Sequence, residues 1–169
     1  PADRRALRRS ASRRRIASVK AADMAKTDLS SETLHATCVA IDGRALLIEG
    51  RSGAGKSDLA LRLIDRGATL VSDDYTRLTR SGDALIASAP ETIRGRMEVR
   101  GLGIMEFDTI DQVPVGLLLA IDEQPLRLPL SYDIRRIAGI AVPVVAIAAL
   151  EASAPIKAEL ALRRVETLR

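Results

Sequence analysis

The sequence predicts an α/β domain built around a phosphate-binding loop, with a mixed sheet that is rich in strands. Residues 50–57 read Gly-Arg-Ser-Gly-Ala-Gly-Lys-Ser, which fits the pattern of glycine, four residues, glycine, lysine, then serine or threonine. An apolar strand-like segment precedes this loop, and a helix-like segment follows it. Hairpin signals outnumber strand–helix–strand units elsewhere, so we expect antiparallel as well as parallel strand pairs.

Composition narrows the class of protein. The chain has 169 residues, 47% of them hydrophobic, which suits one domain with a substantial core. Aromatic residues make up only 2%, so the core should be aliphatic. The single cysteine, Cys38, excludes an internal disulfide framework and suits a reducing compartment. With no apolar run of membrane-spanning length and no signal-peptide pattern, we expect a cytoplasmic protein without a membrane partner.

The positive charge is concentrated at the start of the chain. Residues 1–23 hold eight Lys or Arg against two Asp, whereas residues 24–169 hold eighteen against twenty Asp or Glu. Nonspecific binding of nucleic acid or anionic lipid is one interpretation, and a disordered, solvated segment is another. Met24 also resembles an initiator, which would make residues 1–23 an upstream extension. We expect residues 1–33 to form a basic, disordered tail with no assigned function or specific nucleic-acid partner, and the domain to span residues 34–169.

The first half of the domain should begin with a hairpin. Thr37–Ile41 and Ala45–Glu49 are apolar strand patterns, and Asp42-Gly43 between them is a strong two-residue turn signal. His35 precedes the first strand and is the only histidine of the chain. By itself, it is better explained by a surface or capping role than by catalysis.

The phosphate loop has a clear chemical rationale. Its glycines allow backbone angles that turn successive amide hydrogens toward a phosphate, and the helix predicted over residues 58–66 adds its positive N-terminal end. Lys56 can reach the terminal phosphates, and the Ser57 hydroxyl can ligate magnesium. The alternative is a glycine-rich turn with a solvated lysine, which the flanking strand and helix disfavour. The expected nucleotide-binding residues are Gly50, Arg51, Ser52, Gly53, Ala54, Gly55, Lys56 and Ser57.

Two acidic constellations follow the loop. Asp73 and Asp74 end a short predicted strand, Ala68–Ser72, where they suit magnesium binding, general-base work or a plain capping turn. If strand geometry persists there, at most one of them should face the phosphates. After a hairpin predicted over residues 77–87, Glu98 and Arg100 share one strand face. They could stabilise a charged transition state, or they could form an exposed ion pair that contributes little to stability.

The remaining segments are simpler. Val115–Ile121 is an apolar strand that ends at Asp122, a rival magnesium ligand by analogy with other phosphate-loop enzymes, or a plain strand end. Ser131–Ile137 is predicted as a short helix, Ala141–Ile147 as a strand, and Lys157–Leu168 as an amphipathic helix.

Several of these motifs together resemble one family. Residues 97–104, Met-Glu-Val-Arg-Gly-Leu-Gly-Ile, are similar to the signature of HPr kinase/phosphorylase, an enzyme that phosphorylates a serine of the phosphocarrier protein HPr and can reverse that reaction. The phosphate loop, residues 71–74 and His35 fit the same family in order and spacing, over residues 34–150. The chain resembles short family members that lack an N-terminal domain. The family's arginine- and glycine-rich segment near the C-terminus, linked to dephosphorylation, is not evident after Pro143.

The resemblance implies roles for particular residues. His35, Lys56, Asp74 and Arg127 would be catalytic, with Asp74 as the base, and Ser57 and Glu98 would hold magnesium. It also implies ATP and Mg²⁺ as cofactors, HPr or a related phosphocarrier as partner, and a homo-oligomer, by resemblance a hexamer. A small-molecule phosphate-loop kinase and a nucleotide-sensing regulatory protein with little catalysis are the alternatives.

Overall fold

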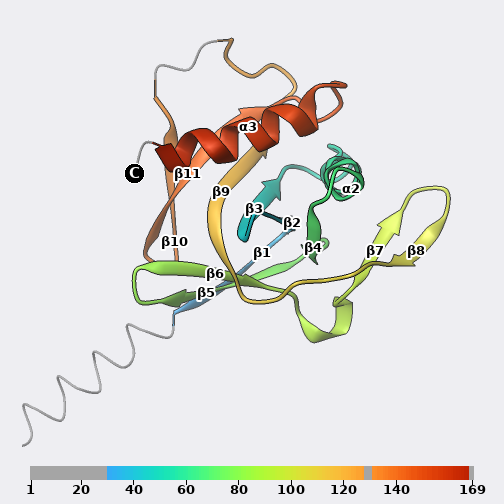
Figure 1. The fold of residues 1–169 in the computed structure, drawn as a ribbon, viewed down its shortest axis with the longest axis horizontal. Coiled ribbons are helices and arrows are strands. Elements are labelled where there is room, and N and C mark those ends of the chain that lie inside the picture. Colours follow the sequence, from blue (N-terminus) through green and yellow to red (C-terminus); the bar gives the residue numbers. More distant parts are fainter. Residues whose placement is uncertain (1–29, 128–130, 168–169) are drawn as a thin grey trace, which may run out of the picture.

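The computed structural model describes residues 30–127 and 131–167, which form one strand-rich sheet, a separate hairpin and two longer helices (Figure 1). The strands of the first half are β1 (Ser31–Leu34), β2 (Ala36–Ile41), β3 (Arg44–Glu49), β4 (Thr69–Ser72), β5 (Thr76–Ser81) and β6 (Ala84–Ser88). Those of the second half are β7 (Arg96–Val99), β8 (Gly103–Glu106), β9 (Val113–Ile121), β10 (Asp133–Ile137) and β11 (Ile140–Ile147). The helices are α2 (Lys56–Asp65), the 3-10 turn η1 (Glu91–Ile93) and α3 (Ala154–Thr167).

The main sheet is mixed, as the sequence predicts. Its strands follow the order β1-β5-β6-β9-β3-β2-β4, and β11 pairs with the far part of β9 and with β10. Strands β3, β9 and β11 are parallel, whereas the other pairs of the sheet are antiparallel. The parallel strands therefore end at one common edge, and the phosphate loop leaves the sheet from that edge.

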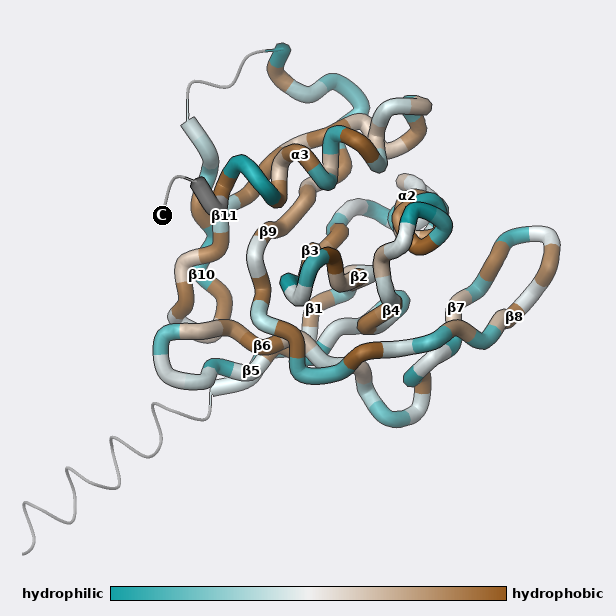
Figure 2. The backbone as a smooth tube through the Cα atoms, viewed as in Figure 1, coloured by the Kyte–Doolittle hydropathy of each residue, from teal (hydrophilic) through white to brown (hydrophobic). Residues whose placement is uncertain are grey.

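Both faces of the central strands are buried because residues alternate along each strand. Leu46, Ile48, Leu117 and Leu119 face α2 and α3, while Leu47 and Leu118 face the side closed by β5, β6 and β10. A strand covered on both faces reads as a continuous apolar run, and β9 appears largely apolar in Figure 2.

The two helices lie on the same side of the sheet and pack against each other (Figure 1). The Arg66 guanidinium donates two hydrogen bonds to the Glu159 carboxylate, 2.7 and 2.9 Å long, and joins the end of α2 to α3. Arg62 of α2 donates to the carbonyls of Ala149 and Glu151, the latter at 3.1 Å. These bonds fix the turn after β11 against α2.

The hairpin signals are confirmed. Asp42 and Gly43 both have positive φ, 50° and 75°, which is the two-residue turn that matches strand twist. Strands β5 and β6 pair as predicted, and β7 and β8 form the hairpin of the family-like segment. That hairpin extends from the body beside α2 (Figure 1).

The short helix predicted over Ser131–Ile137 is wrong, because residues 133–137 form strand β10. Ala138 and Gly139, with φ of 48° and 80°, make a tight turn that returns the chain along β11. Ile137 is fully buried against the rest of the sheet, whereas Arg136 is exposed and Arg135 is half-buried. Pairing with β11 outweighs the local helical preference.

The predicted start of the domain at residue 34 also needs correction. Residues 31–34 form β1, which pairs with β5 along its whole length. The Ser30 carbonyl accepts a hydrogen bond from the Arg80 amide, so the order extends to residue 30. The rest of the tail expected over residues 1–33, residues 1–29, lies outside the described residues. Within the described ranges, neither helix combines the length and apolarity that crossing a membrane requires.

Leu63 of α2 offers a test of the packing under the phosphate-loop helix. Its side chain is 1% exposed, whereas Leu160 of α3 is 56% exposed. We expect Leu63→Ala to lower the free energy of unfolding by about 2–5 kcal/mol, because it removes buried methyl groups and leaves a cavity. Leu160→Ala is the matched control and should change it by less than about 0.5 kcal/mol. Urea unfolding followed by circular dichroism measures both, and equal losses would contradict this packing.

Candidate functional site

The phosphate loop connects β3 to α2 in a conformation that requires glycine. Gly53 and Gly55 have φ of 78° and 98°, in the left-handed region that L-residues rarely adopt. A Cβ at Gly50 would lie 3.0 Å from the Ile121 Cβ, so this position also needs the smallest side chain. The loop is therefore pressed against the end of β9, and the N-terminus of α2 points its amides into the loop.

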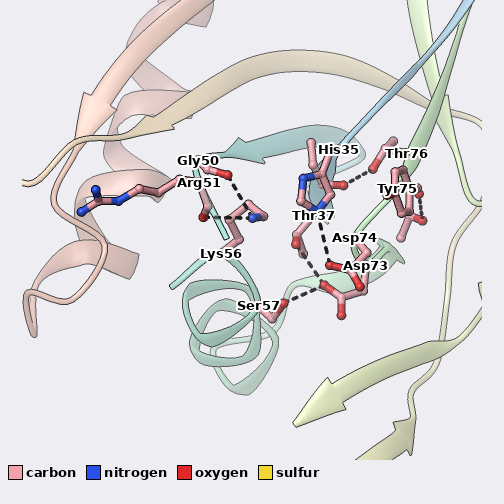
Figure 3. A network of polar contacts seen from close by, with 12 residues as sticks. His35, Thr37, Gly50, Arg51, Lys56, Ser57, Asp73, Asp74, Tyr75 and Thr76 are labelled. Carbon is pink, nitrogen blue, oxygen red and sulfur yellow. Dashed lines mark hydrogen bonds and ion pairs between the residues drawn. The ribbon is translucent and has the colours of Figure 1, made fainter. Parts of the chain in front are cut away.

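Lys56 lies across the loop. Its side chain is 6% exposed, and its Nζ donates to the Gly50 carbonyl at 3.0 Å and to the Arg51 carbonyl at 3.3 Å (Figure 3). Both acceptors are loop carbonyls that leave the ammonium beside the cavity. An anion bound in the loop would meet this charge without any movement of the backbone.

Asp73 connects three elements at the back of the cavity. It is 5% exposed, and its Oδ1 accepts hydrogen bonds of 2.9 Å from the Ser57 hydroxyl of α2 and from the Thr37 hydroxyl of β2 (Figure 3). A buried carboxylate with two donors is satisfied and fixed in direction. The carboxylate therefore fixes the position of the Ser57 oxygen, the expected magnesium ligand.

Asp74 lines the cavity as well, and the expectation that at most one of the pair would face the phosphates does not apply, because it required strand geometry to persist. Strand β4 ends at Ser72, and Asp74 has a φ of 62°, so the alternation of a strand does not persist. Its Oδ1 lies 3.7 Å from the His35 Nε2, and both side chains are about half exposed, 59% and 49%. The His35 ring lies beside that of Tyr75, with centroids 5.2 Å apart. The histidine and the aspartate form an open pair at the cavity mouth.

Glu98 reaches the same cavity from the β7–β8 hairpin. Met97, next to it, is 1% exposed and anchors β7 in the core beneath α2. Glu98, Val99 and Arg100 then line the cavity opposite the phosphate loop. The cavity has a volume of about 570 Å³ and also includes His35, Lys56, Ser57 and both aspartates in its wall.

Two residues named by the sequence lie elsewhere. Asp122 follows β9, accepts a hydrogen bond from the Gln124 amide at 3.0 Å, and lines a second cavity on the other side of the loop. Arg127 is an exposed residue of the loop after β9 and is not among the residues that line either cavity. The first cavity is thus lined by Ser57 and Glu98 but not by Asp122. Arg127 is also absent from the residues that line it.

The oxygen donors of the cavity suit magnesium better than a metal ion that is coordinated by protein side chains alone. Among the described residues, no three His, Cys, Asp or Glu side chains gather closely enough to hold an ion by themselves. Mg²⁺ usually takes one or two protein oxygens and completes its shell with water and substrate phosphate. A Ser57 hydroxyl and a carboxylate across an open cavity fit that requirement.

The sequence pattern treated Asp73 and Asp74 as a pair, and the family resemblance assigned a role to Asp74 alone. The importance of Asp73 depends on Thr37, which lies on a strand that pairs with β4 although thirty-six positions separate it from Asp73. The alternation of strand faces, applied to residues 73 and 74, gave no help because the strand ends before them. The one usable signal was the position of Asp73 as the first carboxylate after a buried strand.

Comparison with known proteins agrees with this geometry. A family model described as the HPr Serine kinase C-terminal domain matches residues 27–112, which contain the whole first cavity except Leu150. An HPr kinase/phosphorylase of Clostridium botulinum (strain Eklund 17B / Type B) is 38% identical over 106 residues, covering 62% of this chain and 34% of that protein. One of Limosilactobacillus reuteri (strain DSM 20016) is 35% identical over 129 residues, covering 69% of this chain and 40% of that protein. The chain therefore spans well under half of these relatives.

A solved structure is similar over more of its own length. It is described as the HPr(Ser) kinase/phosphatase from Coxiella burnetii, with a TM-score of 0.70 and 34% identity, and the match covers 81% of this chain and 97% of that one. Asp122 and Arg127 lie beyond the family match, whereas the phosphate loop, both aspartates and Glu98 lie within it. Because this match spans half of the sequence and the fold agrees, the chain belongs to the HPr serine kinase C-terminal domain family.

Proposed function

We propose that this protein transfers a phosphoryl group from ATP to a serine of HPr or a related phosphocarrier protein. The observation that carries the proposal is the single cavity that joins a phosphate loop, a serine oxygen held by Asp73, and an exposed carboxylate at its mouth. Relatives named HPr kinase/phosphorylase support the choice of substrate. The reverse reaction, attack of phosphate on phosphoserine, belongs to the same proposal.

The loop and Lys56 bind and orient the phosphates. Backbone amides at the start of α2 would donate to the bound phosphates, and the Lys56 ammonium, which the Gly50 and Arg51 carbonyls hold beside the cavity, would stabilise the negative charge of the transferred group. Ser57 and Glu98 would hold magnesium, which when bound neutralises charge on the phosphates. Asp73 keeps the Ser57 hydroxyl in place for this task.

Asp74 acts at the open side. It accepts the proton of the substrate serine while the serine oxygen forms a bond to phosphorus and the bond to the leaving diphosphate breaks. In reverse, the protonated Asp74 returns that proton to the departing serine oxygen. His35, 3.7 Å from Asp74, orients the carboxylate at the mouth, where a protein loop can enter. The exposure of this pair suits a macromolecular substrate better than an enclosed small molecule.

Two parts of the proposal rest on family resemblance alone, namely Arg127 as a further catalytic arginine and a hexameric assembly. A cytoplasmic location rests on the single cysteine and on the sequence patterns, and not on contacts in the cavity. Residues 1–29 receive no function.

Labelling of HPr tests the substrate directly. With ATP labelled on the γ-phosphate, we expect label on a serine of HPr, and Lys56→Ala should abolish it because the transferring group loses its nearest fixed positive charge. Lys157→Ala, at an exposed lysine of α3, is the matched control and should label normally. Label on a small metabolite but not on HPr would contradict the proposed substrate.

The choice of magnesium ligand predicts a different pattern. Glu98→Gln should raise the magnesium concentration for half-maximal turnover by at least roughly tenfold, since a neutral amide is a poorer ligand for a hard cation. Glu106→Gln, on the same hairpin, and Asp122→Asn, beside the second cavity, should leave it nearly unchanged. Turnover against magnesium concentration measures all three, and a shift for Asp122→Asn alone would refute the role of Glu98.

Replacement of Asp74 should affect the chemical step alone. Asp74→Asn should keep the affinity for nucleotide and magnesium but slow single-turnover transfer by roughly a hundred- to ten-thousand-fold, the usual cost of losing a general base. Asp73→Asn serves for comparison. Because it disturbs the Ser57 hydroxyl, it should mainly raise the magnesium concentration needed for turnover. Normal single-turnover rates for Asp74→Asn would show that the pair is only a turn.

A further inference from the structure

A second cavity lies on the other side of the phosphate loop. Its walls are residues 51–54 of the loop, residues 121–124 after β9, and residues 148–151 after β11. Because β3, β9 and β11 are parallel, these three segments leave the sheet at the same edge. The volume is about 1370 Å³, against about 570 Å³ for the catalytic cavity, so there is room for a nucleoside.

The chemistry of this cavity differs from that of the first. Part of its wall is aliphatic, formed by Ala54, Ile121, Ala148, Ala149 and the exposed side chain of Leu150. Its rim carries three carboxylates, Asp122, Glu123 and Glu151, of which Glu123 pairs with Arg51 and Glu151 pairs with Lys157 of α3. Because the cations at this rim are already paired with carboxylates, the site suits phosphate less than the first cavity does, and it accepts a flat apolar group that bears amino or hydroxyl donors.

The two cavities are continuous along the loop. Ser52, Gly53 and Leu150 line both of them. Leu150 is 77% exposed, and its Cδ2 lies 3.0 Å from where a Cβ on Gly55 would be. Arg62 fixes this turn by donating to the carbonyls of Ala149 and Glu151. One extended ligand can therefore keep its phosphates in the loop and place its other end beside Leu150.

We propose that the second cavity is the nucleoside subsite, which takes the purine base and ribose of the nucleotide whose phosphates the loop binds. The base lies against the aliphatic wall, and the rim carboxylates accept hydrogen bonds from its amino group and from the ribose hydroxyls. This inference rests on the proposed function, and it adds the position at which the protein holds the nucleoside. It also gives Asp122 a task other than magnesium binding.

Photolabelling with 8-azido-ATP maps the base directly. We expect the attachment site, found by mass spectrometry of the digested wild-type protein, within residues 121–124 or 148–151, and excess ATP should prevent the labelling. Attachment within residues 73–74 or 97–100, which belong to the catalytic cavity alone, would overturn the proposal.

A variant that fills the cavity gives an independent measurement. Ala148→Leu should weaken the binding of ATP and ADP by roughly tenfold or more, because it occupies the space of the base. It should change the affinity for tripolyphosphate, which has no base, by less than about twofold. Ala141→Leu, at an exposed position at the other end of β11, is the matched control for an added side chain on this strand. Thermal unfolding confirms that each variant is folded.

The outcomes separate this inference from the function on which it rests. If Ala148→Leu weakens the binding of tripolyphosphate as much as the binding of ATP, the second cavity does not hold the base. The same conclusion follows if the variant binds ATP normally but has a higher KM for HPr. If the wild-type protein binds neither ATP nor tripolyphosphate, the proposed kinase function itself fails. If Ala148→Leu loses affinity for ATP but not for tripolyphosphate, and photolabelling occurs after β9 or β11, the results support both the nucleoside subsite and the kinase function.

Discussion

The carboxylate of Asp73 is the contact on which the geometry of the site depends. It is almost fully buried, and one of its oxygens accepts hydrogen bonds from a helix hydroxyl, Ser57, and from a strand hydroxyl, Thr37. A buried carboxylate without such donors would cost several kcal/mol, so the three groups stabilise one another only as a set. This set fixes α2 against β2 and β4, and with it the direction in which the phosphate loop opens.

The same region shows how the backbone releases one aspartate from the core and buries the other. Asp73 follows the last residue of β4 and is buried, and the left-handed conformation of Asp74 then turns the chain outward toward His35. Aspartate tolerates this conformation better than most residues, because its short side chain can hydrogen-bond locally. Two adjacent carboxylates thereby acquire different surroundings, one satisfied by hydroxyls and one open to solvent, which suits one for positioning and the other for proton transfer.

The parallel strands explain why the loop has a cavity on each side. Strand β3 delivers the loop between β2 and β4 on one side and β9 and β11 on the other. The polar cavity forms where the antiparallel strands and the β7–β8 hairpin meet the loop, and the aliphatic one forms where the parallel strands end. In α/β sheets, ligands commonly bind beyond the carboxyl ends of the strands. This topology therefore puts the proposed catalytic cavity and the proposed nucleoside subsite on different sides of the loop.

The sequence by itself determined the local features. The glycines and the lysine of the phosphate loop, the Asp42-Gly43 turn, the alternating strands and the family-like signature are patterns of neighbouring residues, and they gave the fold class, the family and the outline of the cavity. Only the tertiary structure decided which distant groups meet. The pairing of Thr37 with Asp73, the presence of Glu98 in the same cavity as Ser57 while Asp122 lines the other cavity, and the strand formed by residues 133–137 all depend on contacts between segments far apart in the chain. Strand register and the burial of carboxylates are set by those long-range contacts, and local propensity carries no record of them.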